Sequence, residues 1–381
     1  MLYFDSCSTT KPLPEVVQTM SEVMASYFGN PSSIHRIGAE AEKLVKMARD
    51  VVARSLRVEP ESVIFTSGGT ESNNTAIVGA ALQYRSRGKH LVTTEIEHPS
   101  VYECFRYLET VGFDVTYIKP DRTGKIAAAD VERVIRDDTI LVSVMHVNNE
   151  VGTVQPIREI GQRLRKFRRV LFHVDAVQSI GKIDVDPVEW GVDMMSVSAH
   201  KLGGPKGIGI LYRRKGLQLV PLLHGGGQEH GIRSGTENVP AIVAMAKALR
   251  LATERRPTAE SHMYGLRNRF LNHIKSNPRF VYNGSEQQSD MAPHIVNVSV
   301  LGLKPEVVVH ALAERDIFIS TKSACSSAED KPSRVLLAMG LDESRAASGL
   351  RISFLPDHTP EDVDRLAEHL IQVVEQLGRY Q

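Results

Sequence analysis

Lys201 stands in a sequence setting that solvent-facing lysines rarely have. The apolar run at 192–197 predicts a buried strand that continues through Ser198 and His200 to Lys201, just before a Gly-rich turn at 203–205. An amine at the end of a buried strand is partly desolvated, and desolvation lowers its pKa, so it becomes a usable nucleophile toward an aldehyde cofactor. A strand-end lysine whose ammonium group reaches water fits this stretch equally well, and the rest of the chain has to decide between the two.

A glycine-rich turn offers a second chemical feature, an anion site. A predicted strand at 62–65 enters Thr-Ser-Gly-Gly-Thr-Glu at 66–71, and a helix is expected to begin near Ser72. Such a turn directs backbone N–H groups and the positive end of the helix dipole at one point, where Gly69 and Thr70 would meet a phosphate. The turn lacks the GxxxxGK[ST] pattern of a P-loop, and a Gly-rich turn alone is more often only a turn.

Strands and helices alternate along the middle of the chain, which predicts an α/β fold with a mostly parallel sheet covered on both faces. The hydrophobic pattern predicts helices at 15–27 and 41–56, strands at 91–95, 113–118, 140–146 and 170–174, helices at 101–109, 129–135 and 156–167, and a last amphipathic helix at 363–377.

Polar side chains follow several of these strands at their carboxyl ends, where open α/β sheets bind ligands. Taken singly, each has a structural explanation, such as a helix cap for Asp175 or a satisfied surface histidine for His98. Because all of them fall at one edge of the sheet, we expect a single binding site there. The residues are Thr70, His98, Asn149, Asp175, Gln178, Ser198, His200 and Lys201.

Composition and charge exclude several classes of function. The chain has 381 residues, 42% of them hydrophobic, and a formal net charge of +1, so we expect neither direct nucleic-acid binding nor attraction to an anionic membrane. The basic run at 163–169 fits a solvated helix face better than an RNA site. No long apolar stretch or charged leader precedes the first helix, and we expect a cytoplasmic protein.

The three cysteines lack CxxC spacing, which argues against a disulfide framework and a structural zinc site, and no metal is expected. We expect Cys104 to be a packed thiol on a helix and Cys7 to be incidental. Cys325 lies in a small, polar stretch with little to bury, which is typical of a mobile loop. A reactive role for a thiol therefore falls to Cys325.

Seven motifs, in order along the chain, resemble the NifS/IscS-like cysteine desulfurases, which are pyridoxal 5'-phosphate enzymes of the class V aminotransferase family. They are GGTESNN (68–74), EHPSV (97–101), HVNNEVGTVQP (146–156), HVDAVQSIGK (173–182), SVSAHKLGGPKGIG (196–209), HGGGQEHGIRSGT (224–236) and SACSS (323–327). The resemblance implies the type I PLP-dependent aminotransferase fold. A large PLP-binding domain would span 15–255, and a small domain formed by 1–14 and 256–381 would carry the catalytic cysteine.

The resemblance also implies a role for each matching residue. Lys201 would form the Schiff base and take the substrate's α proton, and Asp175 would face the protonated pyridine nitrogen. Gln178 would bond the phenolic oxygen, His98 would stack on the ring and act as an acid-base group, and Asn149 would lie near ring and substrate. The phosphate would be held by Gly69, Thr70, Ser198 and His200 and, from the neighbouring subunit of a homodimer, Thr236.

Two further matches would make this site a desulfurase. Arg351 would clamp the carboxylate of L-cysteine, since its planar fork suits a carboxylate. The Cys325 thiolate would attack the substrate sulfur, release L-alanine and carry the persulfide to a sulfur-acceptor protein.

The acceptor and the activity have alternatives. The chain stops soon after its last predicted helix, whereas relatives dedicated to an iron-sulfur scaffold carry a longer tail. Two destinations of the sulfur are therefore considered: a dedicated acceptor, such as a tRNA thiouridine synthase that also serves thiamine synthesis, and an iron-sulfur scaffold. A selenocysteine lyase, another class V aminotransferase, and a catalytically silent scaffold protein of the same fold are the other interpretations.

Overall fold

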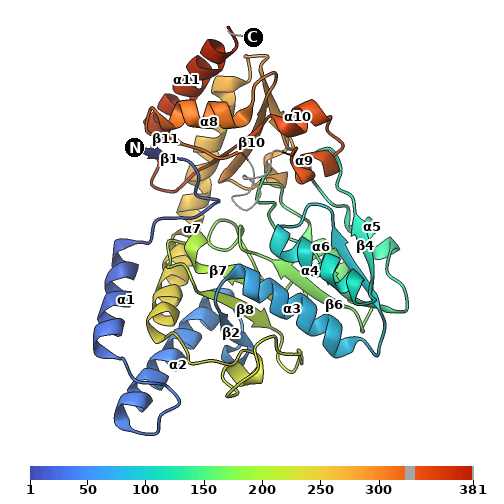
Figure 1. Ribbon diagram of the computed structural model, residues 1–381, viewed down its shortest axis with the longest axis vertical. Coiled ribbons are helices and arrows are strands. Elements are labelled where there is room, and N and C mark those ends of the chain that lie inside the picture. The colour runs from blue at the N-terminus through green and yellow to red at the C-terminus, as the bar shows by residue number, and fades with distance from the viewer. Residues whose placement is uncertain (322–330, 380–381) are drawn as a thin grey trace.

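The computed structural model describes residues 1–321 and 331–379. Its main feature in this part of the chain is a seven-stranded sheet, at the centre of the lower body in Figure 1. Across the sheet the strands are β2 (Val63–Thr66), β8 (Gly209–Arg213), β7 (Met194–Ser198), β6 (Leu171–Asp175), β5 (Thr139–Ser143), β3 (His90–Thr94) and β4 (Asp114–Ile118). Neighbours from β7 to β4 pair in parallel, so the predicted mostly parallel sheet is confirmed.

Strand β8 is the exception in direction, because it pairs antiparallel with both β7 and β2. The chain leaves β7, passes through the short helix η2 (Ala199–Lys201) and the glycine-rich turn, and returns along β8. Lys201 therefore lies at the carboxyl edge of the sheet, as the sequence predicts.

Both faces of the sheet are buried, which explains the continuous apolar runs of its strands. In β7, Met194 packs into the core on one face while Met195 and Val197 pack into the core on the other. Because successive strand residues point to opposite faces, a strand covered on both sides is mostly apolar, and the buried polar residues Ser196 and His173 lie within hydrogen-bond distance of each other at 3.1 Å.

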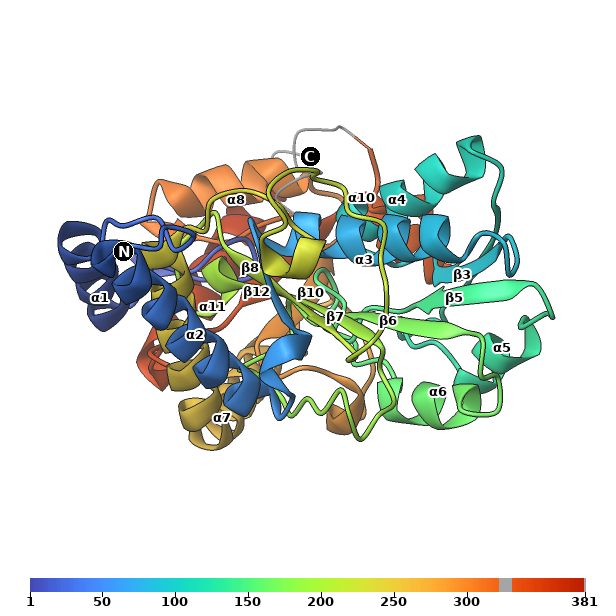
Figure 2. The ribbon, with the colours of Figure 1, turned by 90° about the horizontal axis from the view of Figure 1, so that it is seen from below.

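Helices cover the two faces of the sheet. Figure 2 shows α3 and α4 on one side and α6 and α7 on the other. The helices of this body are α1 (Pro14–Ser26), α2 (Arg36–Leu56), η1 (Pro60–Ser62), α3 (Gly69–Tyr84), α4 (Pro99–Thr110), α5 (Ala128–Arg133), α6 (Ile157–Leu164) and η3 (Glu229–Gly231).

Helix α3 begins at Gly69, earlier than the predicted start near Ser72. This first residue packs against a distant segment: a Cβ at position 69 would lie 2.9 Å from Val177 Cγ2, so glycine allows the first turn to approach Val177 this closely. A contact with a residue so distant in the sequence leaves no local pattern.

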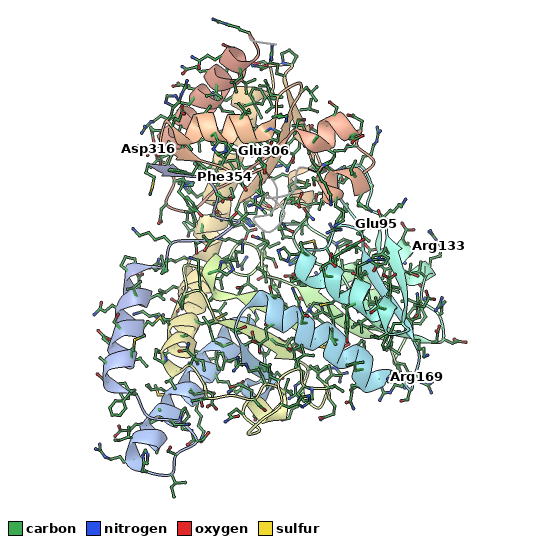
Figure 3. The ribbon with its side chains drawn as sticks, in the orientation of Figure 1. Glu95, Arg133, Arg169, Glu306, Asp316 and Phe354 are labelled. Carbon is green, nitrogen blue, oxygen red and sulfur yellow. The ribbon has the colours of Figure 1, made fainter. Side chains whose placement is uncertain are left out.

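A second body combines the two ends of the chain, as Figure 1 shows in blue and red. Strand β1 (Leu2–Tyr3) pairs in parallel with β11 (Ile317–Phe318), beside the antiparallel sheet of β12 (Gly349–Ser353), β10 (Ile295–Val300) and β9 (Phe280–Asn283). Its core includes Phe4, Phe270 and Phe354, the last of which is labelled in Figure 3. Its remaining helices are η4 (Gln288–Asp290), α8 (Pro305–Ala313), α9 (Arg334–Ala338), α10 (Glu343–Ala347) and α11 (Pro360–Leu377).

Helix α7 (Val239–Ile274) connects the two bodies and contains the predicted boundary at 255. Its first half, through Leu249, packs into the sheet core, whereas its second half, from Ala259, packs into the second core. We propose that the boundary between the two domains lies inside α7, where the helix passes from one core to the other. The chain does not divide into two consecutive segments, since Val335 and Leu336 follow this boundary but pack into the sheet core.

Two negative findings concern the residues that the structure describes. None of their helices is both long enough and apolar enough to cross a membrane. They also contain no group of three or more His, Cys, Asp or Glu side chains arranged to hold a metal ion.

Candidate active site

A cavity of about 170 Å³ lies at the carboxyl edge of the sheet. The predicted site residues that line it are Gly69, Thr70, His98, Asn149, Asp175, Gln178, Ser198, His200, Lys201 and Arg351. Thr236 instead lines a separate cavity with Ser67 and Gly207. Cys325 lies outside the described residues.

The N-terminal segment holds Lys201 at the cavity. The lysine Nζ donates hydrogen bonds to the backbone carbonyls of Cys7 and Ser8, the latter at 2.7 Å. Thr10 fixes the same turn, because its backbone N–H and its hydroxyl both donate to the His200 carbonyl at 2.8 Å. The amine is thus held by main-chain acceptors while it faces the cavity.

Asp175 is the last residue of β6, and its carboxylate is buried. Oδ2 accepts a hydrogen bond from Asn73 Nδ2 at 2.8 Å, and Oδ1 accepts from the Val177 N–H at 3.0 Å. Burial raises the pKa of Asp175, while these two hydrogen bonds and the charge of Lys201 oppose that rise. A cationic group in the cavity would favour the ionised carboxylate further, and a protonated pyridine nitrogen meets that requirement.

His98 caps the amino end of α4. Its Nδ1 accepts a hydrogen bond from the Ser100 N–H at 3.1 Å and lies 2.8 Å from Ser100 Oγ. Burial lowers the pKa of His98 to about 4, and the positive charges of Lys201 and Arg334 act in the same direction. The imidazole is therefore neutral at physiological pH.

The first turn of α3, with Gly69 and Thr70, lines the cavity where the sequence predicts a phosphate site. Gly68 precedes the helix with φ of 152°, a conformation that favours glycine. The free N–H groups of this turn and the dipole of α3 favour an anion. Ser198, Thr70 and His200 line the same cavity, and the His200 Nδ1 lies 3.2 Å from Thr9 Oγ1.

Arg351 is 1% exposed and approaches the cavity from β12. Nη1 donates to the Asn149 carbonyl at 2.9 Å, and Nη2 donates to Asp5 Oδ1 at 2.9 Å and to Ser8 Oγ at 2.7 Å. Its Nε is buried and has no hydrogen-bond partner in the described structure. A guanidinium with an unused buried donor fits a carboxylate ligand.

Cys7 lies closer to the site than the sequence interpretation as an incidental thiol suggests. It lines the cavity, and its carbonyl also accepts a hydrogen bond from Gln178 Nε2 at 3.1 Å. Burial raises the pKa of the Cys7 thiol. The hydrogen bonds that Cys7 accepts from Gln178 and Lys201 use its backbone carbonyl, so they do not depend on the thiol.

One other expectation from the sequence is confirmed: Cys104 is buried on α4, and its Sγ donates to the Ser100 carbonyl at 3.1 Å. In the basic run, Arg163 and Lys166 both pair with Glu132, and Arg169 lies at the outer edge of the molecule in Figure 3. Because α6 ends at Leu164, most of the run at 163–169 follows the helix, and the expected helix face is wrong for that part.

The residues at the cavity fit pyridoxal phosphate, since a lysine, a buried carboxylate, an imidazole and an anion cradle converge on one space. Among the lining residues that sequence reasoning missed are Asn73 and Ser100; the others are Cys7, Ser8, Met145 and Val177. Asn73 and Ser100 lie inside the matching motifs, but nothing in their spacing distinguishes them from ordinary helix residues.

Comparison with known proteins agrees with this site. The aminotransferase class-V family matches residues 2–366. The protein named cysteine desulfurase IscS of Clostridium botulinum is 42% identical over 376 residues, which cover 98% of this chain and 94% of that protein. Among solved structures, a NifS-like protein superposes with a TM-score of 0.92 at 37% identity and covers 99% of both chains.

A structure of SspA in complex with cysteine superposes with a TM-score of 0.81 at 38% identity, covering 94% of this chain and 100% of that one. Because the similarity extends over nearly the whole length, the chain belongs to the aminotransferase class-V family and is a homologue of the NifS/IscS cysteine desulfurases.

Proposed function

We propose that this protein is a pyridoxal-phosphate-dependent cysteine desulfurase that converts L-cysteine to L-alanine and passes the sulfur on as a persulfide of Cys325. The observation that carries the proposal is the convergence of Lys201, Asp175 and His98 on one cavity that Arg351 also lines. A catalytically silent scaffold protein would have no need of a buried carboxylate, an amine and a neutral imidazole in a single cavity.

The cofactor would be held by residues from several elements of the sheet edge. Lys201 would hold its aldehyde, Asp175 would face its ring nitrogen and Gln178 its phenolic oxygen, while the turn at Gly69 and Thr70 would receive the phosphate together with Ser198 and His200. When bound, pyridoxal phosphate supplies an electron sink that stabilises negative charge at the substrate Cα. His98 would lie beside the ring, and the Lys201 amine would take up the Cα proton.

Arg351 and Asn149 orient the substrate. The guanidinium binds the α-carboxylate, and its bonds to Asp5 and to the Asn149 carbonyl fix the plane of the fork. The cysteine-bound SspA relative supports L-cysteine as the amino acid that this pocket receives.

Cys325 receives the sulfur. Its thiolate forms a bond to the substrate sulfur while the substrate's Cβ–S bond breaks, and protons at Cβ and Cα complete L-alanine. The described residues on either side of 322–330 contact the site. Ser320 and Arg351 exchange backbone hydrogen bonds at 3.1 and 2.7 Å, and Ser333 Oγ donates to Glu150 Oε2 at 2.5 Å. Ser320 therefore lies beside the substrate arginine, and Ser333 lies beside Glu150, the residue that follows Asn149.

The functional unit is a homodimer in this proposal. Thr236 does not line the cavity of its own chain, and a contribution to the neighbouring subunit's phosphate site explains that position. The exposed side chains of Met24, Phe28 and Ile34 provide apolar surface that a second copy would cover. Light scattering tests the dimer.

The persulfide goes to a sulfur-acceptor protein, for which we propose a thiouridine synthase-like protein of tRNA thiolation or thiamine synthesis, or an iron-sulfur scaffold. No direct contact with nucleic acid or membrane is part of the function, and the protein is proposed to act in the cytoplasm. Incubating the persulfidated enzyme with each acceptor class and following the labelled sulfur distinguishes them.

The activity is tested by incubating the purified holoenzyme with L-cysteine and a thiol reductant and measuring L-alanine and sulfide. We expect equimolar products, loss of both in Lys201→Ala and in Cys325→Ala, and unchanged rates in Cys104→Ala, whose thiol does not line the cavity. Full sulfide release by Cys325→Ala would refute the mechanism. A strong preference for L-selenocysteine with no turnover of L-cysteine would identify a selenocysteine lyase instead.

A further inference from the structure

A continuous chain of hydrogen bonds joins Asp175 to His98 through two residues that have no assigned role. Asn73 Nδ2, from α3, donates to Asp175 Oδ2 at 2.8 Å and to Ser100 Oγ at 2.9 Å. Ser100, at the start of α4, places the same Oγ 2.8 Å from His98 Nδ1. The two groups predicted to contact the ring are thus connected inside the protein.

The direction of every bond in this chain follows from its donors and acceptors. The Asp175 carboxylate only accepts, so the Asn73 side chain presents its NH₂ group to it. The two hydrogens of that group are then both used, one on Asp175 and one on Ser100 Oγ. The Ser100 hydroxyl accepts from Asn73, so its own hydrogen is available to donate to His98 Nδ1.

The backbone fixes the other end of the chain. The Ser100 N–H can only donate, and it points at His98 Nδ1 from 3.1 Å. Nδ1 therefore receives two donors and cannot carry a proton without opposing the backbone N–H. A neutral imidazole has to hold its proton on one nitrogen, and Nε2 is the nitrogen that remains.

We propose that Asn73 and Ser100 are positioning residues that hold His98 as its Nε2–H tautomer and connect that choice to the Asp175 carboxylate. The catalytic meaning of this tautomer rests on the proposed function. With the proton on Nε2, His98 enters the reaction as a hydrogen-bond donor at Nε2 and not as a base. Asn73 is 1% exposed, and its Oδ1 is buried without a hydrogen-bond partner among residues 1–321 and 331–379, so the amide acts here through its two N–H donors.

The charges around His98 keep the imidazole neutral, while the chain of hydrogen bonds from Asp175 through Asn73 and Ser100, here called the relay, selects its tautomer. The positive charges that face it come from Lys201, Arg334 and Arg351, and His200 adds to them where it is protonated; all of these disfavour a second proton on the ring. Removing the Ser100 hydroxyl removes one of the two donors that stabilise an unprotonated Nδ1. Protonation of His98 should then become easier.

The experiment observes the tautomer directly. Holoenzyme labelled with ¹⁵N-histidine is studied by long-range ¹H–¹⁵N correlation spectra across a pH series, and His98→Gln assigns the His98 signals. Three variants are compared with wild type: Ser100→Ala removes the hydroxyl, Ser100→Thr restores one, and Ser55→Ala removes a remote hydroxyl that bonds only the Val51 carbonyl of its own helix.

We expect wild type, Ser100→Thr and Ser55→Ala to show a protonated Nε2 and an unprotonated Nδ1. Ser100→Ala should show a mixed tautomer population or a His98 pKa raised by about one unit, the scale of one lost hydrogen bond.

Three results would overturn the proposal: a wild-type His98 protonated on Nδ1, a Ser100→Ala spectrum identical to wild type, or a Ser100→Thr spectrum that matches Ser100→Ala. The wild-type spectrum alone tests the tautomer even where a variant folds poorly. A holoenzyme that releases no alanine but shows the Nε2–H pattern would refute the proposed function and leave the relay intact.

Discussion

Replacing Arg351 by lysine keeps a positive charge in the cavity but removes the planar fork. In the structure the two Nη atoms divide between the Asn149 carbonyl on one side and Asp5 with Ser8 on the other. A lysine carries its donors on one nitrogen, which cannot occupy both places and also meet a bidentate carboxylate.

The size of the effect follows from the bonds lost. One hydrogen bond to a charged group contributes about 1.5–3 kcal/mol, and each 1.4 kcal/mol corresponds to about tenfold. We therefore expect Arg351→Lys to lower kcat/KM for L-cysteine by about 10- to 100-fold, mostly through KM. Arg351→Ala also leaves the Asp5 carboxylate without its cation. Breaking a buried ion pair lowers the free energy of unfolding by about 3–5 kcal/mol. Since the Asp5 side chain is 20% exposed, we expect a loss at the lower end of that range.

The assay combines steady-state alanine production with urea unfolding of the holoenzyme. Arg36→Lys is the matched control, because Arg36 pairs with Glu40 on the surface and its side chain is 83% exposed. A wild-type KM in Arg351→Lys, or an Arg351→Ala variant as stable as wild type, would show that the guanidinium neither binds the substrate nor supports the fold as we argue.

Three further predictions concern the cradle, a buried carboxyl and the second thiol. Gly69→Ala should weaken retention of the cofactor, measured by its absorbance after dialysis. It should also lower the free energy of unfolding by about 1–3 kcal/mol, because its Cβ would meet Val177 at 2.9 Å. Gly265→Ala should have neither effect, because a Cβ added there meets no neighbouring atom within 4 Å. Burial raises the pKa of Glu97 from 4.5 to about 8, so the folded chain keeps a proton that the unfolded chain releases, and stability should fall by up to about 1.4 kcal/mol per pH unit between those values. Glu97→Gln should remove that slope in urea unfolding at several pH values, and an unchanged slope would contradict it. Cys7→Ala keeps the carbonyl that binds Lys201, so alanine production should persist, and loss of activity would mean that the Cys7 thiol itself takes part.

The sheet and its ligand edge could be predicted from the sequence because the information is local. Strands buried on both faces need continuous apolar runs, and helices such as α2 need apolar residues at helical spacing, so both leave a pattern in the chain. The polar residues that follow those strands then converge on one edge by topology alone, which is why Asp175 and Lys201 were found together.

The features that were missed depend on contacts between distant segments. Gly69 approaches Val177 closely, and the Lys201 amine is held by carbonyls of Cys7 and Ser8. Asn73 is an ordinary helix residue until the fold places it between Asp175 and Ser100. The passage of α7 from one core to the other is likewise invisible in a helix that continues through Pro257.

The central claim is that sulfur leaves the bound amino acid for one particular thiol. A single turnover of the holoenzyme with ³⁵S-labelled L-cysteine, stopped with an alkylating agent and followed by peptide mapping, tests it most directly. We predict one labelled sulfur on the Cys325 peptide for each L-alanine formed, and none on the Cys7 or Cys104 peptides. Alanine formation with the label on another cysteine, or with no protein-bound label, would contradict the account.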